Sequence, residues 1–319
     1  MPFGSAPANA ERELIVRTTS AMASVIEVLI DGSNSEGDRA LKLVDDVFAR
    51  YEMACSRFAE ESELNCFLRG RRSQSLSLTL GTVLRDAYAA YVETNGRFDP
   101  RVRKVLEDLG YDVTYSALRE PDVAPEPQPI VVPWGNPLKN GAGFIGVVQD
   151  QSLDLGGIAK GAALRAARDA LNLAGLEGLV CAGGDVVVAT RSEHRPWPIA
   201  IEDPIPHAVD PIATIELRVG AVMTSSVRLR QWRAGTTPVH HLIDPRTGAP
   251  GGNGLASVTV IGADPVVAEV WSKTLFLAGF NQGLAEAEDR QLAAIFVSRE
   301  GDVAVSEHGQ PLVTWVRPS

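Results

Sequence analysis

The chain has 319 residues, of which 45% are hydrophobic and 22% charged, proportions that are ordinary for a globular enzyme. Its formal net charge of −10, with no basic stripe to offset it, argues against a nucleic-acid-binding protein. The three cysteines are odd in number and lack the spacing of a metal site, so we expect reduced thiols. Neither a membrane-spanning apolar run nor a signal-peptide pattern is found, which predicts a cytoplasmic protein without membrane insertion.

The first part of the chain is predicted to begin with strands and to continue with helices. Residues 14–32 are rich in Val, Ile and Thr and predict two short strands or one bent strand. Apolar residues at three- and four-residue steps predict a helix around 40–51 and another over 79–94. Between these helices, residues 56–70 predict a loop followed by a short helix.

The second half of the chain is predicted to be mostly strands. The proline-rich stretch 121–137 predicts a surface excursion, and a helix is expected over 158–173 with Gly175 as its cap. Short β-type runs separated by Gly and Pro come next, then a helix over 266–277 and a terminal hairpin turning at 300–302. Helices do not alternate strictly with strands, so the pattern favours an α+β fold over a doubly wound sheet.

The segment DLGGIAKG is the first with a chemical signal. Gly156 and Gly157 precede a helix whose first amides lack partners, and Lys160 adds a positive charge there. The spacing matches neither the dinucleotide fingerprint nor a P-loop. An anion-binding turn and a merely tight strand-to-helix turn with a solvated lysine remain equally open for this segment alone.

Four other segments are candidates, and each is a weak signal when taken alone. In AGGDVVV, Gly183 and Gly184 allow close backbone approach beside Asp185, although a simple turn explains them equally well. In HHLIDPRTG, a histidine next to an aspartate indicates a general base or ligand, or else a hydrogen-bonded core pair. The remaining features are hydroxyls at a strand end, at Thr224 and Ser225, and a turn carboxylate in NGRFDPRV.

Taken together and in this order, DLGGIAKG, AGGD, TSS, HLIDPRTG and AEVWSKTLFLAG resemble the ApbE family of flavin transferases. Upstream, AMASVIEVLI, SRFAEESEL and GRFDPRV are similar to further family segments, so the resemblance runs from about residue 20 to 279. It implies transfer of FMN from FAD to a Ser or Thr hydroxyl of a target protein, with a divalent cation, usually Mg²⁺. It also implies two lobes of mixed or antiparallel sheet with flanking helices and a cofactor cleft between them, in a single domain over 19–319 after a tail over 1–18.

The resemblance also implies roles for individual residues. Phe58 would offer a stacking face for a flavin or adenine ring, Lys160 would face the diphosphate, and Leu242 with Ile243 would contribute backbone groups. The full set of cofactor-binding residues expected on this basis is Met22, Phe58, Arg97, Phe98, Asp99, Asp154, Lys160, Gly183, Gly184, Asp185, Thr224, Ser225, Leu242 and Ile243.

Catalysis and metal binding are expected from a second set. His241 is the candidate general base for the incoming hydroxyl, and Asp244 would orient it. The resemblance places the cation at the carbonyl of Gly157 and at Glu269 and Lys273, where the family usually has Asp followed four residues later by Thr. A charged lysine cannot bind a cation, and Ser272 is one residue away as a substitute oxygen ligand.

Two interpretations follow from this departure. In one, the chain is a divergent flavin transferase whose metal is held by Glu269 or is partly replaced by the charge of Lys273. In the other, it keeps FAD binding but acts as a flavin-binding module or as a pyrophosphatase that splits FAD into FMN and AMP. A chance match in an unrelated cytoplasmic enzyme is the third alternative.

Overall fold

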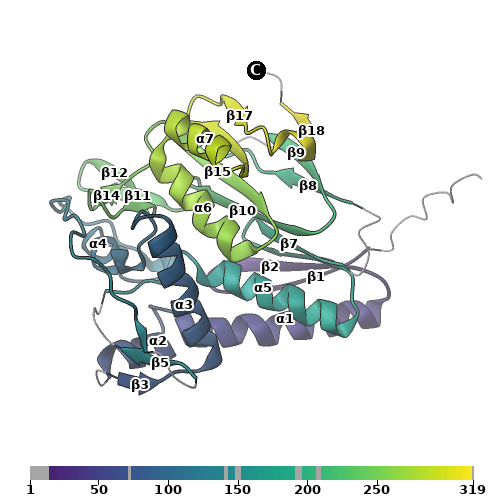
Figure 1. Cartoon of the computed structure of the whole chain (residues 1–319), viewed down its shortest axis with the longest axis horizontal. Coiled ribbons are helices and arrows are strands. Elements are labelled where there is room, and N and C mark those ends of the chain that lie inside the picture. Colours follow the sequence, from purple (N-terminus) through teal and green to yellow (C-terminus); the bar gives the residue numbers. More distant parts are fainter. Residues whose placement is uncertain are drawn as a thin grey trace, which may run out of the picture.

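A computed structural model describes residues 14–70, 73–139, 143–147, 152–190, 196–205 and 210–317 (Figure 1). The helices are α1 (Asn34–Cys55), α2 (Glu63–Arg69), α3 (Leu78–Glu93), α4 (Arg103–Asp108), α5 (Ala159–Ala174), α6 (Pro265–Ala278) and α7 (Phe280–Asp289), with short 3₁₀ helices at Pro100–Val102, Tyr115–Ala117 and Gln310–Leu312. The strands are β1 (Leu14–Ala21), β2 (Ser24–Asp31), β3 (Ser73–Ser75), β4 (Leu138–Lys139), β5 (Ile145–Val147), β6 (Gly178–Ala182), β7 (Asp185–Ala189), β8 (Trp197–Ile201), β9 (Ala213–Leu217), β10 (Gly220–Ser226), β11 (Gln231–Ala234), β12 (Thr237–His240), β13 (Ile243–Asp244), β14 (Ala249–Pro250), β15 (Leu255–Gly262), β16 (Ala293–Ser298), β17 (Val303–Val305) and β18 (Val313–Val316).

The centre of the fold is an eight-stranded sheet in the order β1-β2-β6-β7-β10-β15-β16-β17. Every neighbouring pair in it is antiparallel. Strand β7 reads Asp-Val-Val-Val-Ala and is buried along its whole length, because successive side chains enter opposite layers. Val187 packs into the core on the helical face, whereas Val186 and Val188 pack into the core on the other face.

Helices cover one face of this sheet. Helix α1 packs on α5 and on the β1–β2 hairpin, and α6 packs on β10 and β15 and against α5 (Figure 1). Helix α5 is rich in alanine, the best helix former, and ends at Gly175, which adopts the left-handed conformation with φ 73°. Arg165 of α5 pairs with Asp264 at the start of α6 (3.1 Å) and with Asp86 of α3, which ties three helices together.

Two smaller layers complete the molecule. The sheet β18-β9-β8 covers the other face of the large sheet through a separate apolar core. Helix α4 packs with the β11–β12 hairpin in a third core, and the stretch 121–137 runs alongside without helix or strand. That stretch is fastened at Pro121, whose carbonyl accepts from Gly235 (2.8 Å), and at Ile130, whose amide donates to Pro245 (2.8 Å). Its Trp134 is buried.

The predicted α+β class is confirmed, and the helices expected over 79–94, 158–173 and 266–277 agree within one residue at each end, whereas the helix expected around 40–51 extends over 34–55. The tail predicted over 1–18 is too long, because residues 14–18 already pair with β2; residues 1–13 lie outside the described part of the chain. Helix α7 was not predicted: it follows Gly279 directly, and Gly283 in its interior weakens the helical pattern. The two lobes with a cleft between them stay a prediction.

The contact between α5 and α6 gives a first test. A methyl group on Gly161 would lie 2.7 Å from Glu269 Oε2 and 2.9 Å from the carbonyl oxygen of Pro265. We expect Gly161→Ala to lower the free energy of unfolding by about 1–3 kcal/mol, as overpacking does, although alanine is by itself the better helix former. Urea denaturation checks this, and a gain in stability would contradict the close packing.

Candidate functional site

The turn before α5 is built around Asp154. Its Oδ1 accepts from the amide of Gly156 (2.7 Å), and its Oδ2 pairs with Arg57 Nε at 3.0 Å. The Asp154 amide donates to the carbonyl of Pro100 (2.7 Å), which joins the turn to the segment that carries Phe98. Asp154 therefore shapes the turn before α5, and its partner Arg57 was not predicted from the sequence.

Lys160 lies in the first turn of α5 and points to the start of β7. Its Nζ is 2.6 Å from Asp185 Oδ2, and Oδ1 of the same carboxylate accepts from the Thr224 amide (2.7 Å). Burial acts to lower the pKa of Lys160, but the charges of Asp185 and Glu269 outweigh it and raise that pKa above its ordinary value. The ammonium group therefore stays charged, held at a fixed place by a buried carboxylate.

The turn between β6 and β7 lies beside this ammonium group. Gly183 and Gly184 have φ of 58° and 92°, the left-handed values that a two-residue hairpin turn requires and that favour glycine. A methyl group on Gly183 would lie 4.0 Å from Lys160 Nζ and 2.9 Å from Ser24 Oγ. Ser24 begins β2, directly after the two turn residues Met22 and Ala23. The AMAS and AGGD segments thus lie side by side at Lys160, and their roles in cofactor binding stay predictions.

Glu269 connects α6 to the start of α5. It is 2% exposed; its Oε2 accepts from the Gly161 amide (2.7 Å) and its Oε1 pairs with Lys273 Nζ (3.1 Å). Gly161 is in the first turn of α5, where amides lack partners within the helix. Glu269 therefore caps a neighbouring helix, and the anion site expected at this helix end is in part filled by the protein's own carboxylate.

Ser272 does not face this carboxylate. Its fully buried hydroxyl donates to the Glu269 carbonyl (3.0 Å) and contacts Ser225 Oγ at 2.8 Å. Thr224 contacts Thr259 through its hydroxyl (2.9 Å). The hydroxyls expected to bind cofactor or metal are thus engaged between β10, β15 and α6. The two hydroxyls of Ser272 and Ser225 contact each other between α6 and β10, and their roles at the metal and the cofactor stay predictions.

Lys273 runs past Gly157 toward Glu269. A methyl group on Gly157 would lie 3.3 Å from Lys273 Cε and 3.5 Å from the Phe98 ring. The donors expected for Mg²⁺ are therefore one carbonyl, one carboxylate already paired with an ammonium ion, and one buried hydroxyl. This set does not fit a divalent cation, which prefers several hard oxygen ligands and is repelled by a neighbouring positive charge. Among the described residues, no three His, Cys, Asp or Glu side chains are grouped as a metal site needs.

Two neighbouring histidines are held neutral. His241 is close to Arg230, whose carbonyl lies 3.3 Å from its Nδ1; burial, and then the charge of Arg230, lower its pKa well below the ordinary value. For His240, burial and the charge of Arg299 lower the pKa to about 4. In His241, Nδ1 faces the Arg230 carbonyl and therefore carries the proton of the neutral ring. Its Nε2 is then the acceptor, which is the atom a general base uses to take up a proton.

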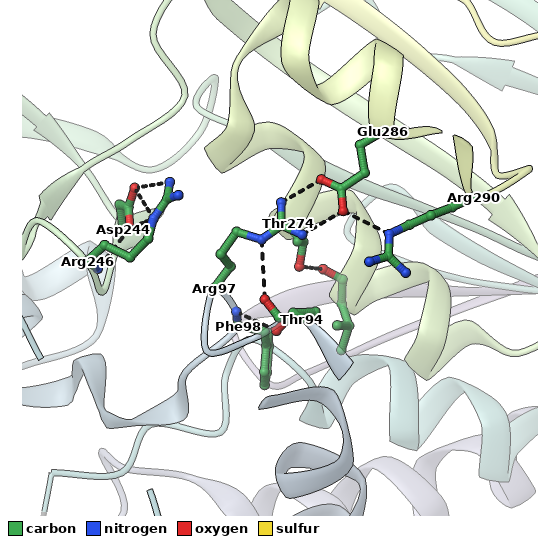
Figure 2. Close-up of polar contacts among 9 residues, drawn as sticks. Thr94, Arg97, Phe98, Asp244, Arg246, Thr274, Glu286 and Arg290 are labelled. Carbon is green, nitrogen blue, oxygen red and sulfur yellow. Dashed lines mark hydrogen bonds and ion pairs between the residues drawn. The ribbon is translucent and has the colours of Figure 1, made fainter. Parts of the chain in front are cut away.

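Asp244 is paired elsewhere than predicted. Its Oδ1 accepts from the amide and Nε of Arg246 (2.9 and 3.0 Å), and its Oδ2 accepts from the same guanidinium (2.7 Å) (Figure 2). Asp244 therefore shapes the DPRTG turn, and the expectation that it orients His241 is corrected. Leu242 and Ile243 have buried side chains, and the Leu242 carbonyl accepts from Gly251 (3.0 Å).

The GRFDP segment is also tied down by ion pairs. Arg97 makes two contacts to Glu286 of α7, of 2.5 and 2.6 Å, and Glu286 also accepts from Arg290 (Figure 2). Asp99 is buried and pairs with Arg101 at 2.6 Å. These two members of the predicted cofactor set instead stabilise the segment that holds the buried ring of Phe98 near Gly157.

The ring of Phe58 is accessible, so its stacking against a flavin or adenine ring stays a prediction. Its ring is 37% exposed, and the Arg57 guanidinium lies 4.1 Å from its centroid. Arg57 also lies over the ring of Tyr111 (4.6 Å) and donates to the Tyr111 carbonyl (2.6 Å). Sequence analysis missed Arg57 and Tyr111, and no spacing rule would have joined residues so far apart along the chain.

The fold and the site together define a class of protein. An antiparallel α+β fold places the Gly-Gly-Asp turn between β6 and β7 beside the lysine at the start of α5. The ApbE family model matches residues 21–296, and the chain belongs to the ApbE family.

Relatives and solved structures agree with this assignment. The chain is 35% identical over 156 residues to an FAD:protein FMN transferase of Klebsiella pneumoniae, covering 48% of each chain. It is 26% identical over 285 residues to one of Vibrio cholerae, covering 84% of this chain and 80% of the other. The crystal structure of the ApbE protein of Thermotoga maritima superposes with a TM-score of 0.79 at 25% identity, covering 94% of this chain and 99% of that one. The chain spans about half the length of the Klebsiella relative.

The neutral histidines predict acid sensitivity. In the folded protein His240 stays neutral down to its pKa of about 4, whereas in the unfolded chain it takes a proton below the ordinary value of 6.5. The unfolded state therefore binds more protons between these values, so stability falls as pH is lowered through this window. We expect His240 to account for about 2 kcal/mol lost between pH 7 and pH 5.

The measurement is the free energy of unfolding as a function of pH. The matched variant is His240→Asn, which keeps an acceptor for the Leu242 amide (3.3 Å) and does not titrate. In this variant, the slope of the free energy of unfolding against pH, between pH 4.5 and 6, should be smaller than in the unmodified protein. The difference should reach up to about 1.4 kcal/mol per pH unit, which is the contribution of one proton. An unchanged slope would contradict the assignment of a buried neutral His240.

Loss of the Arg97–Glu286 ion pair is expected to lower the stability of the protein and to leave FAD binding unchanged. Removing one partner of this largely buried pair, as in Arg97→Met or Glu286→Gln, should lower the free energy of unfolding by about 1–3 kcal/mol. The double variant should lose clearly less than the sum, because both changes break the same contact. FAD affinity should stay within about threefold, and a larger loss in Arg97→Met alone would restore Arg97 to the cofactor site.

Proposed function

We propose that this chain is an FAD:protein FMN transferase, which moves FMN from FAD to a Ser or Thr hydroxyl of an acceptor protein and releases AMP. The observation that carries the proposal is the place of Lys160: its ammonium group is fixed by Asp185 (2.6 Å) beside the Gly183-Gly184 turn, at the start of α5. Such a group stabilises the negative charge of a diphosphate. Relatives that carry this activity by name support it.

The transfer needs one bond made and one broken. The acceptor oxygen forms a bond to the phosphorus on the FMN side of the diphosphate. The bond from that phosphorus to the bridging oxygen breaks, and its electron pair leaves with AMP. The proton of the acceptor hydroxyl goes to a base, and the neutral His241 is our candidate, with its Nε2 as the accepting atom.

Mg²⁺ is the cation that the resemblance implies for this reaction. When bound to a diphosphate, it neutralises charge that develops on the phosphate oxygens. The residues expected to hold it here are Gly157, Glu269 and Ser272, and this donor set does not fit, since Lys273 pairs with the carboxylate and Ser272 is buried under α6. We therefore derive the transfer from Lys160 and His241 alone.

We also propose a cytoplasmic acceptor, because the three cysteines Cys55, Cys66 and Cys181 are free thiols, as is usual in a reducing compartment. In the described part of the structure, no helix combines the length and the apolar character that crossing a bilayer demands. The acceptor must present its hydroxyl to the side of the site where Lys160 and His241 lie.

The activity test combines purified protein, FAD and an acceptor domain, and follows the intact mass of the acceptor. We expect a mass increase that corresponds to FMN, together with release of AMP. Lys160→Met should weaken FAD binding about ten- to hundredfold, as loss of a charged hydrogen bond does, and should abolish most of the adduct. Lys42→Met is the matched control, because Lys42 is 78% exposed on α1.

Three results would change the proposal. FAD bound with AMP released but no adduct would point to the pyrophosphatase alternative. FAD bound with neither AMP nor adduct would leave a flavin-binding module, and no FAD binding at all would remove the function altogether.

A further inference from the structure

We propose that Lys273 is the resident cation of this site, so that the protein binds the diphosphate of FAD without a divalent metal ion. The inference rests on the proposed function, since it concerns the same ligand. It assigns to Lys273, together with Lys160 and Arg230, the positive charge that a metal ion would otherwise supply.

The first argument is that Glu269 is already engaged on both oxygens. Oε2 accepts from the Gly161 amide (2.7 Å) and Oε1 pairs with Lys273 Nζ (3.1 Å). With the side chain 2% exposed, a cation that approached Oε1 would have to displace the ammonium group or lie next to it. Displacement would leave a lysine that is only 19% exposed without its partner, which is strongly unfavourable.

The second argument is the place of Lys273 itself. Its stem lies against Gly157, in the turn that precedes α5, and a methyl group there would meet Cε at 3.3 Å and Cδ at 3.6 Å. The charge of Lys273 also contributes to lowering the pKa of His241, after burial and the charges of Arg230 and His240. Lys273 thus places its positive charge at the turn that precedes α5, beside the carboxylate of Glu269.

The third argument is the balance of charge. A carboxylate with Mg²⁺ has a net charge of +1, whereas Glu269 with Lys273 is neutral, as is Asp185 with Lys160. Arg230 supplies the additional positive charge. It is close enough to shift the pKa values of Lys160 and His241, and no ion pair joins its guanidinium to a described residue. Three fixed cations and two carboxylates therefore leave a net charge of +1 at the site without any metal ion.

The test measures FAD affinity of the full chain, by quenching of flavin fluorescence, in EDTA and in excess Mg²⁺. We expect the two dissociation constants to agree within about twofold, because the charge at the site is built in. Calorimetric titration of Mg²⁺ into the complex of protein and FAD should give no more heat than titration of Mg²⁺ into FAD alone. This comparison uses the unmodified protein and does not depend on the folding of any variant.

Variants then assign the effect to Lys273. Lys273→Thr should weaken FAD binding in EDTA about ten- to hundredfold, and Mg²⁺ should restore part of the loss, because the carboxylate of Glu269 becomes free. Lys273→Arg should keep most of the affinity in EDTA. Lys42→Thr, on the exposed face of α1, is the matched control and should change nothing. Melting temperatures establish that each variant is folded.

The outcomes separate this inference from the proposed function. FAD affinity that rises more than about tenfold with Mg²⁺ in the unmodified protein would overturn the inference and leave the function standing. Unchanged affinity in Lys273→Thr would overturn it as well. No FAD binding with or without Mg²⁺ would overturn the proposed function, and this inference with it.

Discussion

The hydrogen bond between the Gly161 amide and the Glu269 carboxylate is the contact on which the site depends. It sets the distance between α5 and α6, because a side chain at Gly161 would meet both Glu269 and the Pro265 carbonyl. With α6 fixed in this way, the Lys273 stem lies against Gly157 and the Ser272 hydroxyl lies under the helix. A helix-packing constraint thus decides which side chains face the turn before α5 and which are lost to the core.

The same contact changes the meaning of the helix start. Unpaired amides at the beginning of a helix attract anions, and the Gly-Gly turn before Lys160 indicated such a site. In the folded chain, a buried carboxylate of the protein already occupies one of these amides. Attraction for a diphosphate therefore has to come mainly from side-chain charges, and Lys160 is placed for this by Asp185, which is itself held by the Thr224 amide.

The sequence predicted the parts of this arrangement that depend on local pattern. The helix after DLGGIAKG, the Gly183-Gly184 turn and the α+β class all follow from spacing and from the residues that turns require. What it could not predict are contacts between distant segments.

Asp244 was expected beside His241 but pairs with Arg246, because a two-residue separation within a turn brings a guanidinium closer. Ser272 was expected at the metal because only its position in the chain was visible, whereas its partner Ser225 comes from β10. Arg57 and Arg230 have no motif of their own.

A lysine in place of a divalent cation has consequences for both binding and chemistry. An ammonium group is covalently attached, so it is present at every concentration of free metal and donates hydrogen bonds in fixed directions. The single charge of an ammonium group polarises a phosphate oxygen less than Mg²⁺ does. The ammonium group therefore stabilises the bound diphosphate well, but it stabilises less well the transition state, in which charge accumulates on the leaving oxygen. The neutral His241 keeps a free base available at neutral pH. The site therefore combines metal-free binding with a proton acceptor, and the rate of transfer depends on how far three fixed cations can replace a Lewis acid.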